Sequence, residues 1–176
     1  QGATVLSEVV PAALGKLPDQ IKVRLDVTQQ CREEDISMVK AAYGEIGVRA
    51  HLATFIDDVP ERMAKSHVVI SRAGASTVAE ALAVGRPSIL VPYPYAADDH
   101  QSYNAQAVDA AGAGWIMPQD AFTAENLALR LDSVVGLPAV LEKSPRCARA
   151  LGRAHAAKHL AGMVAGLNEH SQEPRD

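Results

Sequence analysis

Extended segments alternate with helical segments along most of this chain. Apolar patterning typical of strands occurs at residues 21–27, 48–56, 67–71, 88–91 and 115–117, and the first of these alternates strictly between apolar and charged residues. Helical periodicity lies between them, at residues 5–14, 33–46, 57–65, 77–84 and 100–111. Strands and helices that alternate in this way form βαβ units. We therefore predict an α/β fold with a doubly wound, Rossmann-like parallel sheet.

The remaining chain and the composition fit one domain. Thr123 is predicted to begin another helix, and Pro138 and Pro145 are predicted to separate two further helices that end near Leu167. We assign residues 1–167 to the domain and residues 168–176 to a polar tail. Of the 176 residues, 48% are hydrophobic and 22% charged, which is enough for a substantial core.

Charge, cysteine and histidine usage exclude several classes of protein. Lys and Arg number 17 against 21 Asp and Glu, so a net charge of −4 gives no footprint for nonspecific binding to nucleic acid or anionic lipid. Cys31 and Cys147 form no metal-ligand pattern and suggest a reduced, cytoplasmic setting. His155 and His159 lie four residues apart but lack the HExxH context of a zinc site. We predict no metal and no cofactor.

The start of the chain is unusual. It begins at Gln1 without an initiator Met or a secretory signal, and its first residues lead directly into a helical pattern. No apolar run approaches the roughly 20 residues that span a bilayer. We expect the sequence to be a fragment that lacks the strand and loop preceding this helix.

Ligands of doubly wound sheets bind at the loops that follow the carboxyl ends of the strands. The candidate loops here follow Val27, Phe55, Ser71 and Val91. After Ser71, Gly74 allows a ligand to approach the backbone, and Ser76 and Thr77 lie where a helix is predicted to begin. Unpaired amides and the helix dipole make such a loop suitable for phosphate, although neither the Walker A motif nor G-x-G-x-x-G is present.

Glu80 in the same segment has two interpretations. Thr77-x-x-Glu80 has the spacing of a capping box, in which Glu80 only satisfies an amide at the helix start. Alternatively, the carboxylate accepts hydrogen bonds from both hydroxyls of a ribose. The residues alone favour the cap.

Two other loops carry polar residues. After Val91, Asp98 or Asp99 precedes His100, Gln101 and Asn104 at a helix entrance, a group able to bind sugar hydroxyls. The alternative is an N-cap followed by a solvated first turn. After Phe55, Ile56 is followed by Asp57 and Asp58, two candidate caps for the next helix.

Several of these motifs together resemble the carboxyl-terminal half of the MurG family of bacterial glycosyltransferases. The resemblance rests on residues 71–80, on Gly85-Arg86-Pro87-Ser88 and on Asp98-Asp99-His100-Gln101 with Asn104-Ala105. Phe55-Ile56-Asp57-Asp58 and the opening Gln1-Gly2-Ala3, similar to the end of a family G-G-S-Q-G-A loop, occur in the expected order. The match covers residues 1 to about 167.

The resemblance implies a GT-B fold of which this chain is the donor-binding half. It implies that Gly74, Ala75, Ser76 and Thr77, continued by Val78 and Ala79, cradle the diphosphate of a UDP-sugar, and that Glu80 binds the ribose. Ile56 would border the uracil, with Arg72 near that pocket, while His100, Gln101 and Asn104 would face the sugar. Gln1, Gly2 and Ala3 would be the remnant of a second phosphate loop. These implications reverse the preference for Glu80 towards a ligand role.

The implied reaction is metal-independent, inverting transfer of N-acetylglucosamine from UDP-GlcNAc to undecaprenyl-diphospho-muramoyl-pentapeptide in peptidoglycan synthesis. The helix dipole and backbone amides would stabilise the charge on the departing UDP. The catalytic base, the contact with the lipid-linked acceptor and the contact with the cytoplasmic face of the inner membrane are expected in the missing half. Two alternatives remain: another GT-B UDP-sugar transferase, or a separate nucleotide-sugar-binding subunit that needs an acceptor-binding partner.

Overall fold

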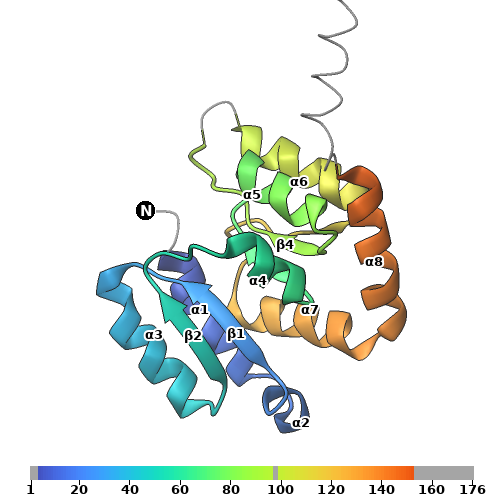
Figure 1. Ribbon diagram of the computed structural model, residues 1–176. Helices are drawn as coiled ribbons and strands as arrows, with labels where there is room; N and C mark the ends of the chain where they lie inside the picture. The colour runs from blue at the N-terminus through green and yellow to red at the C-terminus, as the bar shows by residue number, and fades with distance from the viewer. Residues whose placement is uncertain (1–3, 97–98, 153–176) are drawn as a thin grey trace, which may run out of the picture.

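The order of elements in the computed structural model follows the predicted alternation (Figure 1). The structure describes residues 4–96 and 99–152. The elements are α1 (Thr4–Gly15), α2 (Asp19–Lys22), β1 (Asp26–Gln30), α3 (Glu33–Glu45), β2 (Arg49–Ala53), α4 (Val59–Lys65), β3 (Val69–Ser71), α5 (Ala75–Ala83), β4 (Ser88–Leu90), α6 (His100–Ala110), β5 (Gly114–Ile116), α7 (Ala124–Gly136) and α8 (Pro138–Leu151).

All strand pairs are parallel, which confirms the predicted pairing. β1 pairs with β2, with Asp26 opposite Arg49, and β4 lies between β3 and β5, with Ser88 opposite both Val69 and Gly114. Within the described residues, backbone hydrogen bonds divide the strands into a sheet of two and a sheet of three. Gly114 is required in β5 because an added Cβ would collide with the backbone oxygen of Ser88.

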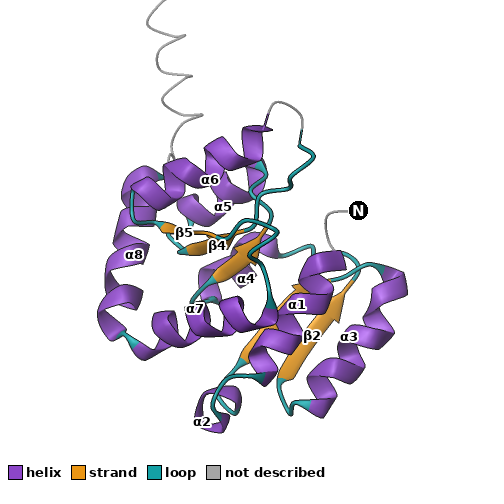
Figure 2. Cartoon of the chain, turned by 180° about the vertical axis from the view of Figure 1, so that it is seen from behind, coloured by secondary structure: helices purple, strands orange, loops and turns teal. Residues whose placement is uncertain are grey.

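Helices cover both faces of the larger sheet, as a doubly wound fold requires. Successive residues of a strand point to opposite faces, and the buried residues around β4 follow this rule. Ile89 and Val91 join a core formed with α1, α3 and α7, whereas Leu90 joins a second core formed with α5, α6 and α8. Figure 2 shows α5 and α6 on one side of β4 and β5, with α7 on the other.

The first core also connects the two sheets. It includes Val27 and Leu52 from the smaller sheet and Ile70 and Ile89 from the larger one. Helix α1 lies over this junction and contacts both α3 and α7. The two sheets therefore share one apolar interior.

The prediction of a strand at residues 21–27 is wrong in its first part. Residues 19–22 form the short helix α2, whose first turn closes through the Pro18 oxygen, and β1 begins only at Asp26. Ile21 and Leu25 both pack against the first core, but Val23 is 74% exposed. Apolar residues four apart satisfy a helical turn as well as an alternating strand, so this pattern was ambiguous.

The prediction at Pro145 is also wrong, because this proline lies inside α8 instead of separating two helices. Proline in a helix interior removes one hydrogen bond. The helix nevertheless continues, since Ser144 and Ala148 are buried on either side of Pro145 and Ala148 joins the second core. The predicted helix end near Leu167 and the pair His155 and His159 lie outside the described residues.

Candidate functional site

The loop from β3 to α5 forms one side of the candidate site. α5 begins at Ala75, with Gly74 as its N-cap at φ −63° and ψ 141°. Helix geometry leaves the first amides, those of Ala75, Ser76 and Thr77, without intrahelical partners, at the positive end of the helix dipole. A Cβ added to Gly74 would meet no atom within 4 Å, so the space above this backbone is open to a ligand.

The capping-box interpretation of Thr77 and Glu80 is wrong. α5 begins two residues earlier than predicted, which makes Thr77 its third residue, whereas a capping box needs threonine at the N-cap. Glu80 lies further along the helix and is exposed. Within the described part of the chain, no hydrogen bond or ion pair of the Glu80 carboxylate is found.

Val78 and Ala79 differ from residues 75–77, because they lie beyond the unpaired amides at the start of α5 and line an apolar groove. The Val78 amide donates to the Gly74 oxygen at 3.0 Å, so it is used inside the helix and is not available to a phosphate. Both side chains line an apolar groove of about 270 Å³ between α5 and α6. The groove reaches Ala75 and Asn104, and Asn104 is its polar member.

The loop from β4 to α6 forms the other side. α6 begins at His100 as predicted, and Asp99 occupies the N-cap with the left-handed φ of 51°. The Asp99 carboxylate accepts a hydrogen bond from the Ser102 hydroxyl at 2.6 Å and does not cap the helix. His100 is exposed, and Asp98 lies outside the described residues.

Two of the predicted sugar-facing residues are held by hydrogen bonds, of which the one from Asn104 connects the two loops and the one to Gln101 lies within the β4–α6 segment. Asn104 Nδ2 donates to the Ala73 oxygen at 3.0 Å, and Gln101 Oε1 accepts from the Tyr93 amide at 3.0 Å. Each amide side chain is thereby held in one orientation. A ligand would meet the Nε2 donor of Gln101 and the Oδ1 acceptor of Asn104.

Arg72 joins both loops to a third one. Its Nη1 donates to the Val91 and Pro92 oxygens, each at 3.2 Å, and its Nη2 donates to Gln119 Oε1 at 2.6 Å. The guanidinium also stacks over the Tyr93 ring, with Cζ 5.3 Å from the ring centroid. Burial lowers the pKa of Arg72, but an arginine stays charged in proteins.

Gln119 was missed by the sequence reasoning. It lies in the loop between β5 and α7, and no motif marks it. Its position after the carboxyl end of a parallel strand is the signal that could have drawn attention to this loop.

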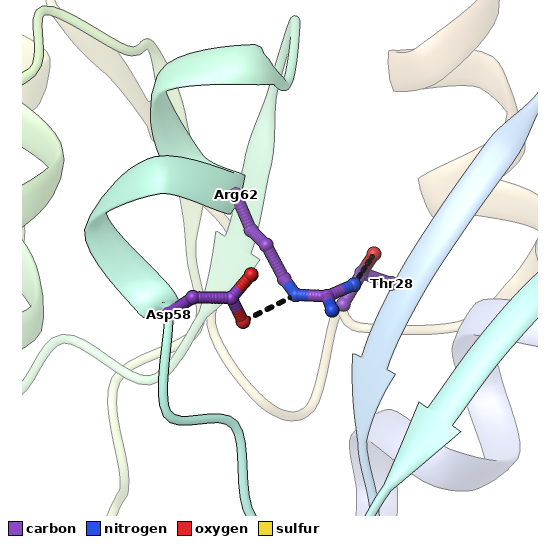
Figure 3. A network of polar contacts seen from close by, with 3 residues as sticks. All are labelled: Thr28, Asp58 and Arg62. Carbon is purple, nitrogen blue, oxygen red and sulfur yellow. Dashed lines mark hydrogen bonds and ion pairs between the residues drawn. The ribbon is translucent and has the colours of Figure 1, made fainter.

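The loop after β2 belongs to the smaller sheet. Ile56 is half-buried. Asp58 occupies the N-cap of α4, but its carboxylate accepts from Arg62 Nε at 2.6 Å and does not cap the helix (Figure 3). This hydrogen bond lowers the pKa of Asp58. Arg62 Nη1 also donates to Thr28 Oγ1 at 3.4 Å, which ties α4 to β1.

The predicted phosphate-loop remnant Gln1, Gly2 and Ala3 lies outside the described residues. Among residues 4–96 and 99–152, no three His, Cys, Asp or Glu side chains are grouped so that they could hold a metal ion. In the same ranges, every helix is too short or too polar to cross a bilayer.

Comparison with known proteins gives consistent matches. Residues 1–160 match the family model described as glycosyltransferase family 28 C-terminal domain. The chain is 54% identical over 167 residues to the UDP-N-acetylglucosamine–N-acetylmuramyl-(pentapeptide) pyrophosphoryl-undecaprenol N-acetylglucosamine transferase of Paramagnetospirillum magneticum, covering 95% of this chain and 45% of that protein. It is 52% identical over 166 residues to the protein of that name from Rhodospirillum centenum, covering 94% of this chain and 44% of that protein.

Among solved structures, MurG of Acinetobacter baumannii matches with a TM-score of 0.82 at 29% identity, over 94% of this chain and 49% of that one. This match confirms the predicted α/β architecture as one half of a GT-B fold. The chain spans less than half the length of each of these three relatives.

Proposed function

The chain belongs to the family of glycosyltransferase family 28 C-terminal domains, and on this basis we propose that it is the donor-binding half of a transferase. The proposed reaction transfers N-acetylglucosamine from UDP-GlcNAc to undecaprenyl-diphospho-N-acetylmuramoyl-pentapeptide. The names of the two curated relatives support this choice of donor and acceptor.

One observation carries the proposal for this chain. An open helix N-terminus at Gly74 lies at the carboxyl end of β3, and the exposed Glu80 follows on the same helix. Ser76 and Glu80 are four residues apart, so they share one face of α5 and are separated by about 6 Å along the axis. We propose that the amides of residues 75–77 bind the diphosphate and that the Glu80 carboxylate accepts from the ribose hydroxyls.

The other loops complete the proposed donor site. We assign Gln101 and Asn104 to the sugar, which would accept a hydrogen bond from Gln101 Nε2 and donate one to Asn104 Oδ1. His100 is assigned to the same sugar, and Ile56 to the edge of the uracil. Arg72 stays assigned near the uracil pocket, and because its Nη atoms donate to Val91, Pro92 and Gln119, we also assign it to holding the loops.

Chemistry at this site consists of stabilising the departing UDP. Negative charge develops on the β-phosphate as the glycosidic bond breaks, and preorganised amides at a helix N-terminus favour that charge. We assign the activation of the acceptor hydroxyl, and contact with the cytoplasmic face of a membrane, to the part of such a protein that this chain does not span.

Titration calorimetry of the 176-residue chain tests the proposal. UDP-GlcNAc and UDP are expected to bind, with UDP-GlcNAc binding more tightly than UDP-glucose or UDP-GalNAc. No heat at millimolar UDP-GlcNAc from a chain with a folded circular dichroism spectrum would contradict the proposal. Equal affinity for the three sugars would favour the alternative of another UDP-sugar transferase.

A further inference from the structure

Gln119 lies in the loop between β5 and α7, which is not among the proposed contacts with the ligand, and its side chain accepts a hydrogen bond from Arg72. We propose that Gln119 is a positioning residue of the donor site, which sets the place of the β4–α6 loop through Arg72. The inference rests on the proposed function, because it concerns how that site is held before the ligand arrives.

The first step of the argument is the geometry of the guanidinium. Arg72 Nη1 donates to two backbone oxygens at the end of β4, while Nη2 donates to Gln119 Oε1 at 2.6 Å. A guanidinium is planar and its N–H groups point in fixed directions. An acceptor that fixes Nη2 therefore also fixes the direction in which Nη1 points.

The second step is that Gln119 lies in a well-anchored turn. The Ala121 amide donates to the Pro118 oxygen at 3.0 Å and to Asp120 Oδ1 at 2.9 Å, and Asn126 Nδ2 donates to the Ala121 oxygen at 2.9 Å. These bonds attach the turn to the first residues of α7. Gln119 therefore holds Arg72 in a place that is set by α7, so that a rigid helix supports a binding loop.

The third step leads from Arg72 to the residues that would face the ligand. Arg72 holds the Val91 and Pro92 oxygens and stacks over the Tyr93 ring, and the Tyr93 amide in turn donates to Gln101 Oε1. The orientation of the Gln101 amide therefore depends on the place of Tyr93. Loss of the Gln119 acceptor should loosen Tyr93 and misplace Gln101 Nε2, the donor proposed for the sugar.

Three variants of the 176-residue chain test this inference. Gln119→Leu removes the acceptor, Gln119→Glu keeps an acceptor beside the guanidinium, and Gln106→Leu makes the same change at an exposed glutamine of α6. We expect Gln119→Leu to raise the Kd for UDP-GlcNAc roughly tenfold and the Kd for UDP much less. Gln119→Glu and Gln106→Leu should stay within about twofold of the unsubstituted chain.

Amide hydrogen exchange of the ligand-free chain gives a second, independent readout. Gln119→Leu should speed exchange at Tyr93 and Ala96, whose amides are hydrogen-bonded in this loop, and leave the amides of α7 unchanged. Unchanged exchange at Tyr93 and Ala96, or equal acceleration by Gln119→Glu, would overturn the inference. Failure of the unsubstituted chain to bind UDP-GlcNAc would contradict the proposed function instead, and the exchange result would still decide the role of Gln119.

Discussion

Asn104 Nδ2 donates a hydrogen bond to the backbone oxygen of Ala73 at 3.0 Å, which fastens α6 to the loop that precedes α5. Ala73 is fully buried and Asn104 is half-buried, so the bond is protected from competing water. The residue expected to face a sugar therefore also fixes the neighbouring loop, and one substitution should affect both the fold and the binding of ligand.

We expect Asn104→Ala to lower the free energy of unfolding by about 1 kcal/mol, the typical value of one such bond. It should also weaken binding of UDP-GlcNAc in calorimetry. Ser66→Ala is a matched control, since the Ser66 hydroxyl also donates a partly buried bond to a backbone oxygen, that of Met63 at 2.8 Å, at the end of α4 and away from the proposed site. The control should lose similar stability in urea denaturation but keep its affinity, and an equal loss of affinity in both variants would speak against a ligand contact at Asn104.

Gly74→Ala should lower the free energy of unfolding by less than about 1 kcal/mol, because alanine is a poorer N-cap than glycine, and should weaken the binding of UDP. Gly74 has a negative φ and open space where a Cβ would lie, so alanine fits the unliganded chain, but the methyl group would occupy the space proposed for the diphosphate. Gly44→Ala is the control, because it also meets open space, lies within α3 and should gain up to about 1 kcal/mol of stability. If calorimetry shows that Gly74→Ala binds UDP as tightly as the unsubstituted chain, the phosphates do not approach the backbone at Gly74 closely.

Glu80→Gln tests the proposed ribose contact with little change in shape. Loss of the negative charge should weaken UDP binding by about 1 to 3 kcal/mol, because the ribose hydroxyls would lose a charged acceptor. The melting temperature should stay the same, since the structure gives Glu80 no role in capping α5. The comparison ligand is 2′-deoxy-UDP, which lacks one of the two ribose hydroxyls. Glu80→Gln should therefore lower the affinity for 2′-deoxy-UDP less than it lowers the affinity for UDP.

The pair of Asp58 and Arg62 predicts a pH dependence in the acid range. Arg62 lowers the pKa of Asp58 below its ordinary value of 3.8, so the folded state binds this proton less readily than the unfolded state does. The stabilisation is therefore present above the ordinary pKa and is lost as the pH falls through the lowered value. An NMR titration of the Asp58 carboxyl should show its pKa rise in Arg62→Met, and an unchanged pKa would show that the pair does not form in solution.

The two free cysteines should differ in their reaction with thiol reagents. Cys31 is buried, and burial raises the pKa of its thiol, whereas Cys147 is partly exposed. Because the thiolate is the reactive form, Cys31 should react slowly at pH 8 and faster as the pH rises or the chain unfolds. Mass spectrometry after brief alkylation should find Cys147 modified first, and rapid labelling in Cys147→Ser would contradict the buried position of Cys31.

The order of strands and helices was predictable because each element has its own periodicity. The start of α5 was not predictable, because Ser76 and Thr77 are residue types that often cap a helix, whereas the N-cap of α5 is Gly74. Residues 21–27 were ambiguous because Ile21 and Leu25 suit either period. The burial of Ser144 and Ala148 on either side of Pro145 also outweighed the tendency of proline to end a helix.

The candidate site was predictable in its location and only partly in its roles. Strand ends pointed to the loops of Gly74 and Asn104, and the structure brings these loops together through the bond from Asn104 to the Ala73 oxygen. The internal hydrogen bonds of Arg72, Gln101 and Asn104 were not predictable, since they depend on how three loops meet in space. Gln119 could not be singled out, because a glutamine in a polar turn has no distinguishing pattern.

The apolar interior shared by the two sheets has a consequence for how the chain unfolds. A two-stranded sheet is at best marginally stable by itself, so β1 and β2 depend on the packing of α1 against α7. We therefore expect the chain to unfold as one cooperative unit, so that a substitution that weakens the packing beneath α1 also destabilises the loops that follow β3 and β4. The packing of α1, which lies outside those loops, therefore influences the fraction of molecules in which the loops are folded.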